Sequence, residues 1–349
     1  PLVIAMCFPL TIAIIQVFFS RQVEVYKSLQ QPITNYWTFS DKAFERKWAG
    51  LRIPMETLYE AYFDGKCDIA EGLTVLDVLY ARHAYASFYF TASHVWFFLS
   101  QFIPELLYHT QAQDVDQVRE HYDRGNDFYD KFLGDRMIYT SAYFCHPDEE
   151  LETAQDNKMD KIARAVMLRK GDKHLDIGCG WGTLVNYWSN KYETAVSTGV
   201  TLGRNQTDFG EARSVEMGTN AAARGLDSDF GARFLCMDYR DIVTKDNVLT
   251  KQGLKYDKIT CLEMAEHVGV KNFNAFVTQV YDMLEDDGVF YLQIAGLRRA
   301  WQLEDFNWGL FMAKYVFPGA DASMPLGWDI DQLECGGFEV QSVETIGIH

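Results

Sequence analysis

The feature that most constrains the fold of this chain is a glycine-rich turn after a short apolar run. Residues 175–182 have the sequence Leu-Asp-Ile-Gly-Cys-Gly-Trp-Gly, with glycine at every second position from residue 178. Glycine lets the backbone turn sharply and lie against a ligand, which a Cβ atom would block. The pattern therefore predicts a strand that ends near Ile177, a tight turn, and a helix that begins directly after it.

The spacing of the glycines bears on which ligand such a turn holds. The dinucleotide fingerprint is G-x-G-x-x-G, whereas this turn has G-x-G-x-G after Asp176 and Ile177. The shorter turn favours S-adenosylmethionine (SAM). A glycine-rich turn alone is weak evidence, so a dinucleotide site and a purely structural turn remain open at this point.

A regular alternation of strand and helix patterns follows residue 170. Apolar runs predict strands at 174–177, 195–202, 233–237, 256–262, 289–294 and 338–346, with room for helices between most of them. This alternation predicts an α/β fold with a doubly wound, mostly parallel sheet. Ligands bind at the carboxyl ends of the strands in such sheets. Polar segments stand there, at 201–206, 238–240, 263–267 and 293–296.

The charge and cysteine content exclude some classes of function. The chain has 349 residues, enough for one large or two modest domains, and its net charge is −17. We find no basic patch of the kind that a nucleic-acid-binding surface needs. Seven cysteines without CxxC pairs indicate neither a disulfide framework nor a zinc site, so we expect reduced thiols and no metal.

The N-terminal residues are almost uninterruptedly apolar. Residues 1–19 contain only Thr11 and Gln16 as polar side chains, and as a helix they would reach roughly 28 Å, close to a bilayer core of about 30 Å. We expect a transmembrane helix at 1–20, with a signal-peptide core or a buried helix as alternatives. Arg21 and Lys27 follow it, and if they obey the positive-inside tendency, the rest of the chain is expected in the cytosol. Because Pro1 is not an initiator methionine, we expect a preceding segment.

A second apolar stretch, at 84–104, has no acid, lysine or arginine but is rich in aromatic side chains. Such side chains prefer the headgroup interface, so we expect one or two helices on the membrane surface. A second span and a buried helix of a soluble domain are the alternatives. We expect residues 21–113 to form a membrane-associated helical region. Its small helical subdomain would be packed by Trp37, Phe39, Phe44, Trp48, Leu51 and Leu58.

Four motifs in the same order resemble the cyclopropane fatty acid synthase and mycolic acid methyltransferase family. They are the H-Y-D-x-G-N-D-F-Y run at 121–129, Y-T-S-A-Y-F at 139–144, the glycine turn, and E-M-x-E-H-V-G at 263–269. The resemblance covers about residues 115–349 and is closest to the sphingolipid C9-methyltransferase branch. Segments 137–141, 199–206, 236–241 and 317–323 carry this closer resemblance, and the apolar N-terminal region also fits that branch.

The resemblance implies a SAM-dependent methyltransferase domain at 114–349, without the last helix and strand of the family. It also implies a set of residues that bind SAM, because hydroxyl and amide groups suit the ribose and glycine backbone suits the amino-acid moiety. In this sequence the set is Tyr139, Thr140, Leu175, Asp176, Ile177, Gly178, Cys179, Gly180, Trp181, Gly182, Thr201, Leu202, Gln206, Asp238, Tyr239 and Arg240. Asp238 is further expected to accept a hydrogen bond from the adenine amine. The sequon at Asn205 would lie in this site and remain unmodified.

The chemistry that the resemblance implies is attack by an alkene on the SAM methyl group. The site must hold the alkene close to the sulfonium and tolerate a carbocation, which aromatic faces stabilise. We expect Tyr139, Tyr143, Phe144 and Trp181 to supply those faces. A base then removes a proton. In the C9 branch, loss of the proton from the methylated carbon restores the double bond and leaves a methyl branch.

The sequence departs from the cyclopropane synthases at the residues around their bound bicarbonate. Ser141 replaces their cysteine, Gln293 replaces their histidine, and Glu266 is kept. The family's completing tyrosine would follow His349. These changes leave open whether bicarbonate binds. We expect Glu266 to be the proton-accepting centre, with His267 as a second candidate, although Glu266 as a helix cap and His267 as a core histidine are the structural alternatives.

The resulting hypothesis is a SAM-dependent C-methyltransferase of the endoplasmic reticulum membrane with a cytosolic catalytic domain. Its substrate would be the Δ8-unsaturated sphingoid base of ceramide or glucosylceramide, methylated at C9. Two alternatives stand beside it. One is a cyclopropane synthase that acts on unsaturated acyl chains of phospholipids, and the other is a catalytically inactive membrane lipid-binding protein. The sequence does not determine the headgroup preference or the oligomeric state.

Overall fold

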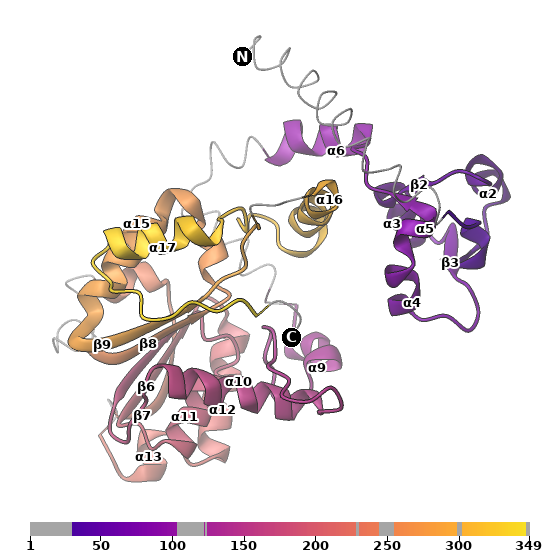
Figure 1. The fold of residues 1–349 in the computed structure, drawn as a ribbon. Helices are drawn as coiled ribbons and strands as arrows, with labels where there is room; N and C mark the ends of the chain where they lie inside the picture. The colour runs from indigo at the N-terminus through magenta and orange to yellow at the C-terminus, as the bar shows by residue number, and fades with distance from the viewer. Residues whose placement is uncertain are drawn as a thin grey trace. The chain divides into compact units, whose positions relative to one another are not determined.

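The computed structural model of the chain describes residues 30–102, 122, 124–227, 230–243, 255–298 and 302–346. Contacts divide the chain into two compact units (Figure 1). The first unit comprises Pro1–Tyr108 and Ala300–Pro318, and the second comprises His109–Arg299 and Gly319–His349. The predicted transmembrane helix at 1–20 lies outside the described residues.

The second unit is built around a five-stranded parallel sheet. Its strands are β5 (Lys173–Ile177), β6 (Val196–Thr201), β7 (Gly231–Cys236), β8 (Tyr256–Leu262) and β9 (Leu284–Gln293). Their order in the sheet is β7-β6-β5-β8-β9, and each neighbouring pair is parallel. The strand order reverses direction beside β5, which is where doubly wound sheets bind ligands. The predicted α/β fold is therefore confirmed.

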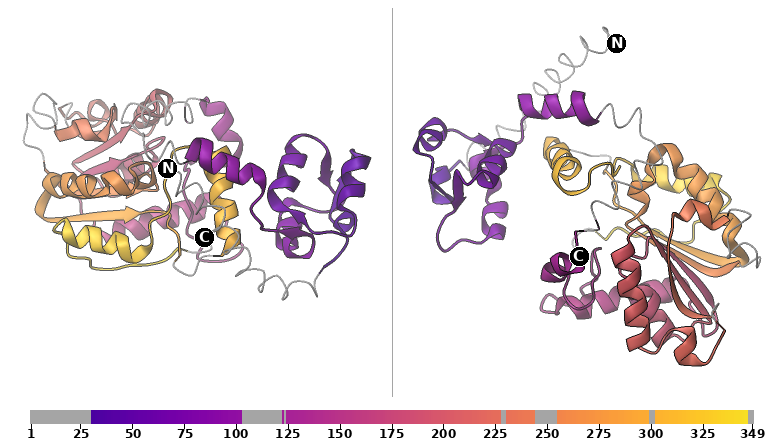
Figure 2. Two further views of the ribbon diagram at one scale, coloured as in Figure 1. Left: turned by 90° about the horizontal axis from the view of Figure 1, so that it is seen from above. Right: turned by 180° about the vertical axis from the view of Figure 1, so that it is seen from behind.

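Helices cover both faces of this sheet, as the two further views in Figure 2 also show. One face packs against α15 (Gly269–Met283) and α17 (Leu326–Cys335), which contribute Phe273, Phe276 and Trp328 to the largest apolar core. The other face carries α10 (Leu151–Ala165), α11 (Thr183–Lys191), α12 (Arg204–Glu216) and the short α13 (Ala221–Arg224). Because both faces are covered, every residue of β6 is buried. A further helix, α9 (Asn126–Leu133), precedes α10.

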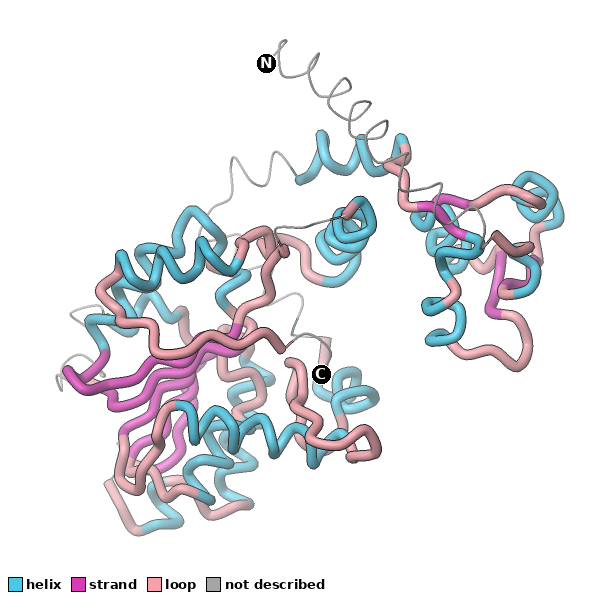
Figure 3. Tube along the Cα trace, viewed as in Figure 1, coloured by secondary structure: helices cyan, strands magenta, loops and turns pink. Residues whose placement is uncertain are grey.

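Only the last predicted strand of this unit is wrong. Residues 338–346 form no strand, and Figure 3 shows this segment as loop. The Phe338 ring packs against Phe290 and Tyr281, while its backbone N–H donates to the carbonyl of Leu333 in α17. The apolar pattern at this position therefore reports side-chain packing and not a hydrogen-bonded ladder.

The first unit is a small mixed subdomain. Strands β1 (Trp37–Phe39) and β3 (Cys67–Ile69) pair antiparallel, and β2 (Ile53–Pro54) pairs in parallel with β4 (Ala86–Ser87). Helices α2 (Lys42–Trp48), α3 (Met55–Phe63), α4 (Val75–Tyr80) and α5 (Arg82–Tyr85) surround them. Side-chain caps begin two of these helices, namely Asp41 for α2 and the Thr74–Asp77 capping box for α4.

Five of the six side chains expected to pack this subdomain do so. Trp37, Phe39 and Leu58 are buried, and Phe44 and Trp48 pack against them. Leu51 is the exception, because it follows the turn at the end of α2 and 58% of its surface is exposed. Besides the helices, this subdomain contains two small sheets that the expectation of a helical subdomain did not include.

Residues 302–318 pack with the first unit, which the sequence did not indicate. They form α16 (Leu303–Phe311) and the π-helix Met312–Val316. The Phe311 and Tyr315 rings pack against Tyr59 of α3, and Lys314 forms an ion pair with Glu60 at 2.8 Å. The unit is thus assembled from segments that are far apart in the sequence.

The apolar stretch at 84–104, where one or two surface helices were expected, contains several short elements within the described residues. It contributes the end of α5, strand β4, helix α6 (Ala92–Phe97) and the π-helix Phe98–Phe102. Tyr85, Ala86 and Phe97 are buried, whereas 72% of the Trp96 surface is exposed. Within the described ranges, no helix combines the length and apolar character needed to cross a bilayer.

Candidate active site

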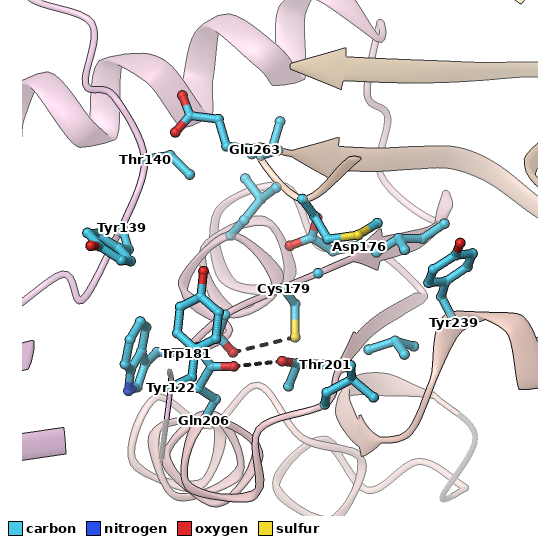
Figure 4. Close-up of a pocket in the computed structure, with 18 of the residues that line it drawn as sticks. Tyr122, Tyr139, Thr140, Asp176, Cys179, Trp181, Thr201, Gln206, Tyr239 and Glu263 are labelled. Carbon is cyan, nitrogen blue, oxygen red and sulfur yellow. Dashed lines mark hydrogen bonds between the residues drawn. The ribbon is translucent and has the colours of Figure 1, made fainter. Parts of the chain in front are cut away.

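A pocket lies at the carboxyl ends of the strands in the second unit (Figure 4). It is lined by fourteen of the sixteen residues expected to bind SAM, and by His267. The two that do not line it are Leu175, which is buried in the core, and Gly182. The pocket therefore brings together residues from the glycine turn, from three further post-strand loops, and from the Tyr139–Thr140 segment.

The three glycines of the turn have different structural roles. All three have positive φ, at +80° for Gly178, +53° for Gly180 and +75° for Gly182. A Cβ atom on Gly178 would lie 2.5 Å from Met264, and one on Gly182 would lie 2.2 Å from Phe234. A Cβ atom on Gly180 would meet no atom within 4 Å. Gly178 and Gly182 thus allow close packing, whereas Gly180 faces the open space of the pocket.

Three described residues of the motif at 121–129, Tyr122, Asn126 and Tyr129, contact Trp181 of the turn. Asn126 accepts a hydrogen bond from the Trp181 indole at 2.8 Å. The Tyr129 ring lies 4.7 Å from the Trp181 ring, and Tyr122 and Tyr139 complete the aromatic group. Tyr122, Tyr139 and Trp181 line the pocket. These contacts explain why two motifs that are distant in the sequence belong to one site.

Two further loops contribute polar groups. Thr201 donates to the Gln206 side-chain oxygen at 2.6 Å, as Figure 4 shows. The Gln206 side chain consequently presents its amide nitrogen as a donor at the pocket. In the next loop, Arg240 donates to both carboxylate oxygens of Asp238, at 2.9 and 2.6 Å. The Asp238 carboxylate therefore forms an ion pair with Arg240. The expected hydrogen bond between Asp238 and adenine did not take this ion pair into account.

Asp176 is held at the pocket by a buried chain of hydrogen bonds. The Thr260 hydroxyl donates to Asp176 at 2.7 Å, and so it accepts from the Nε2 atom of His174 at 2.8 Å. The Nδ1 atom of His174 then accepts from Ser197 at 2.8 Å. Burial raises the pKa of Asp176 to about 7 and lowers the pKa of His174 to about 3.

The raised pKa of Asp176 predicts a pH-dependent effect of the Asp176→Asn substitution. The folded protein binds a proton at Asp176 below about pH 7, whereas the unfolded chain does so only near pH 3.8. This group therefore adds stability as the pH falls from 7.5 to 5.5, by about 2 kcal/mol. Because asparagine cannot take up this proton, we expect the free energy of unfolding of Asp176→Asn, relative to wild type, to be about 2 kcal/mol lower at pH 5.5 than at pH 7.5. Urea unfolding of both proteins without SAM at the two pH values measures it, and an unchanged difference would contradict it.

Of the five expected catalytic residues, only His267 lines the pocket. Ser141 and Gln293 lie together and both donate to Glu263, at 3.1 and 2.6 Å. Glu266 is buried but does not line the pocket. Its Oε1 atom accepts from the backbone N–H of Ala295 at 2.5 Å, and burial raises its pKa to about 7. The Tyr143 ring is also outside the pocket lining and lies 4.6 Å from the Lys161 ammonium.

Two charged residues that line the pocket, Glu263 and Lys158, were not among the site residues expected from the sequence, although Glu263 begins the polar segment 263–267 that was expected at this edge. The Lys158 side chain is almost fully buried and donates to Thr140. Its burial lowers its pKa to about 8. A signal was available, because Lys158 lies on the face of α10 that carries the buried Ala154 and Ile162. A lysine on the apolar face of a helix is rare unless it has a partner.

The chemical groups that line the pocket suit SAM. An open volume lies over Gly180, amide and hydroxyl groups converge on it, and aromatic faces form one wall. The fold and this pocket together define a SAM-dependent methyltransferase of class I. The chain belongs to the mycolic acid cyclopropane synthetase family, whose model matches residues 109–349.

Curated relatives are sphingolipid C9-methyltransferases. The chain is 47% identical to that of Komagataella phaffii, with 99% of this chain and 70% of the relative covered. It is 49% identical to sphingolipid C9-methyltransferase A of Emericella nidulans, with 97% and 64% covered. It is 48% identical to sphingolipid C9-methyltransferase 2 of Gibberella zeae, with 94% and 60% covered. The chain thus spans between 60% and 70% of the length of these three relatives.

Solved structures support the same family. The cyclopropane synthase MmaA2 from Mycobacterium tuberculosis matches with a TM-score of 0.55 and 26% identity, over 65% of this chain and 76% of that one. The mycolic acid cyclopropane synthase CmaA1, complexed with SAH and CTAB, matches with the same TM-score and identity, over 66% and 76%.

Proposed function

We propose that this chain is the methyltransferase part of an enzyme that methylates C9 of a Δ8-unsaturated sphingoid base in ceramide or glucosylceramide. The observation that carries the proposal is the similarity to sphingolipid C9-methyltransferases over 94–99% of the chain. This similarity extends beyond the second unit into the first unit. The pocket supports it, since it combines an expected SAM-binding turn with aromatic walls and a carboxylate.

The residues of the pocket suit alkene methylation. SAM supplies an electrophilic methyl group when it is bound. The faces of Tyr139 and Trp181 can stabilise positive charge on the substrate by about 2 kcal/mol in a site that excludes water. The partly apolar lining, with Met137, Ile138 and Leu262, suits a hydrocarbon chain better than a polar substrate. A carboxylate then takes the proton whose loss restores the double bond.

We also propose that the first unit lies on the cytosolic surface of the endoplasmic reticulum membrane. Its exposed side chains support this: Val75, Leu76 and Tyr80 on α4 and Trp96 on α6 are all more than half exposed. Exposed tyrosine and tryptophan favour the headgroup interface. Co-sedimentation of the chain with phospholipid vesicles tests this placement, and equal recovery of Trp96→Ser and wild type with the vesicles would argue against a role for α6.

The function is tested by lipid mass spectrometry. The full chain is incubated with SAM and a Δ4,8-sphingadienine ceramide, and we expect a product heavier by the mass of one CH₂ group. NMR then separates a vinyl methyl group from a cyclopropane ring, which has the same added mass. Ring protons would identify a cyclopropane synthase. Failure of SAM to bind in calorimetry would favour the lipid-binding alternative.

A further inference from the structure

We propose that Glu263 is the carboxylate that accepts the proton from the methylated carbon, and that Ser141 and Gln293 position it. This inference rests on the proposed function and names the base in that reaction. Glu263 directly follows β8, at the edge of the sheet where ligands bind, and lines the pocket. In Figure 4 it lies at the end of the pocket near Thr140, away from Trp181 and Gln206.

The hydrogen bonds to Glu263 are strongly asymmetric. Its Oε1 atom accepts from the Gln293 amide at 2.6 Å and from the Ser141 hydroxyl at 3.1 Å, and the Ser141 backbone N–H lies 3.5 Å away. Gln293 also donates to Ser141 at 3.0 Å, which closes the triangle. Among the described residues, Oε2 receives no such bond. One oxygen is therefore fixed, and the other is left to accept a proton, as a general base requires.

The backbone at Glu263 is held in an unusual conformation. Its φ is +54°, although it is neither glycine nor asparagine. Such a conformation is strained and persists only where the surroundings enforce it. Here the Glu263 N–H donates to the Gln293 carbonyl at 2.8 Å, so the same residue fixes both the backbone and the carboxylate. The fold thus tolerates strain in order to present this side chain.

A buried cation accompanies the carboxylate. Lys158 also lines the pocket, and the charge of Glu263 favours its protonated form. Lys158 donates to Thr140, the residue one position before Ser141. A buried lysine and the carboxylate of Glu263 therefore both line the pocket.

The alkene π electrons form the new bond from C9 to the methyl carbon, the sulfur–methyl bond breaks, and its electron pair stays on the sulfur of S-adenosylhomocysteine. The carbocation is then at C8. Glu263 takes the proton from C9, and the C–H electron pair forms the C8=C9 double bond. The products are the 9-methyl alkene, S-adenosylhomocysteine and a protonated Glu263, which releases its proton to solvent.

Glu266 is the competing base. It stands three residues further along, but it does not line the pocket, and its Oε1 atom is bound to Ala295. Its Oε2 atom is buried without a hydrogen-bond partner among the described residues. The geometry thus favours Glu263 for contact with substrate, and a direct comparison of the two carboxylates decides between them.

The experiment compares Glu263→Gln and Glu263→Gly with Glu266→Gln in the full chain. Glycine adopts a positive φ without strain. We therefore expect Glu263→Gly to keep the backbone conformation at residue 263 even if Glu263→Gln changes it. We expect both Glu263 variants to bind SAM within about threefold of wild type in calorimetry and to lose at least about 100-fold in turnover. We further expect added formate to restore part of the activity of Glu263→Gly, because it supplies a carboxylate to the vacated space.

Glu193 provides a matched control. It has a φ of +51°, is exposed, and lies outside the pocket lining. Glu193→Gln and Glu193→Gly should keep the turnover of wild type and gain nothing from formate. For Ser141→Ala and Gln293→Ala, we expect a lower kcat with an unchanged KM for SAM, as positioning residues predict.

The outcomes separate the two proposals. If wild type forms no 9-methyl product, the proposed function fails. If wild type is active and Glu263→Gln keeps more than about a hundredth of its turnover, the assignment of Glu263 is wrong. If Glu266→Gln alone loses turnover while retaining SAM affinity, Glu266 is the base, as the sequence indicated.

Discussion

Replacing Gly180 by valine is expected to weaken SAM binding by at least about 100-fold, which corresponds to about 2.7 kcal/mol. Gly180 lines the pocket, and a Cβ atom there would meet no protein atom within 4 Å. The valine side chain would therefore occupy the space of the ligand and not displace the protein. Titration calorimetry with SAM measures the change directly.

The backbone strain of this substitution needs its own control. Gly180 has a φ of +53°, so valine also costs folding stability there. Gly218 has a φ of +64° and equally open surroundings, but it lies at the end of α12, outside the pocket lining. Gly218→Val should therefore lose similar stability and keep its SAM affinity. Near-normal affinity of Gly180→Val, or an equal loss in Gly218→Val, would refute the placement of SAM over this turn.

The sheet of the second unit was predictable because its signals are local. Strand β8 has the predicted bounds, and the other four lie within a few residues of the predicted ones, apart from an earlier start of β9 at Leu284. Each buried strand ends in a glycine or polar segment, and these boundaries need no knowledge of distant residues. The pocket followed from the same logic, since parallel strands bring their carboxyl ends to one edge.

The missed features depend on contacts between distant segments. Nothing near Glu263 in the sequence indicates that Ser141 and Gln293 meet its carboxylate, because these residues are 122 and 30 positions away. The same holds for α16, whose aromatic face packs on α3. Local patterns report which side chains pack against the core, as at the half-buried Phe338, but not the partners that they contact.

Thr260→Val is expected to destabilise the second unit by about 3 kcal/mol, because two buried polar groups lose their partner at once and each such loss costs about 1–3 kcal/mol. The Thr260 hydroxyl is fully buried, donates to Asp176 and accepts from His174. Valine has nearly the same shape but no hydroxyl. The pKa of His174 is lowered to about 3 by burial, so at neutral pH the ring cannot gain a charge as compensation.

The matched control is Thr278→Val on the exposed face of α15. Thr278 donates to the backbone carbonyl of Asn274 at 2.9 Å, and solvent can replace that bond. We expect it to change the unfolding free energy by less than about 0.5 kcal/mol. Urea unfolding at pH 7.5 compares both variants with wild type. Because Thr260 orients Asp176, Thr260→Val should also weaken SAM binding at temperatures where it remains folded. Equal stability of the two variants would show that the His174–Thr260–Asp176 chain does not hold the pocket edge.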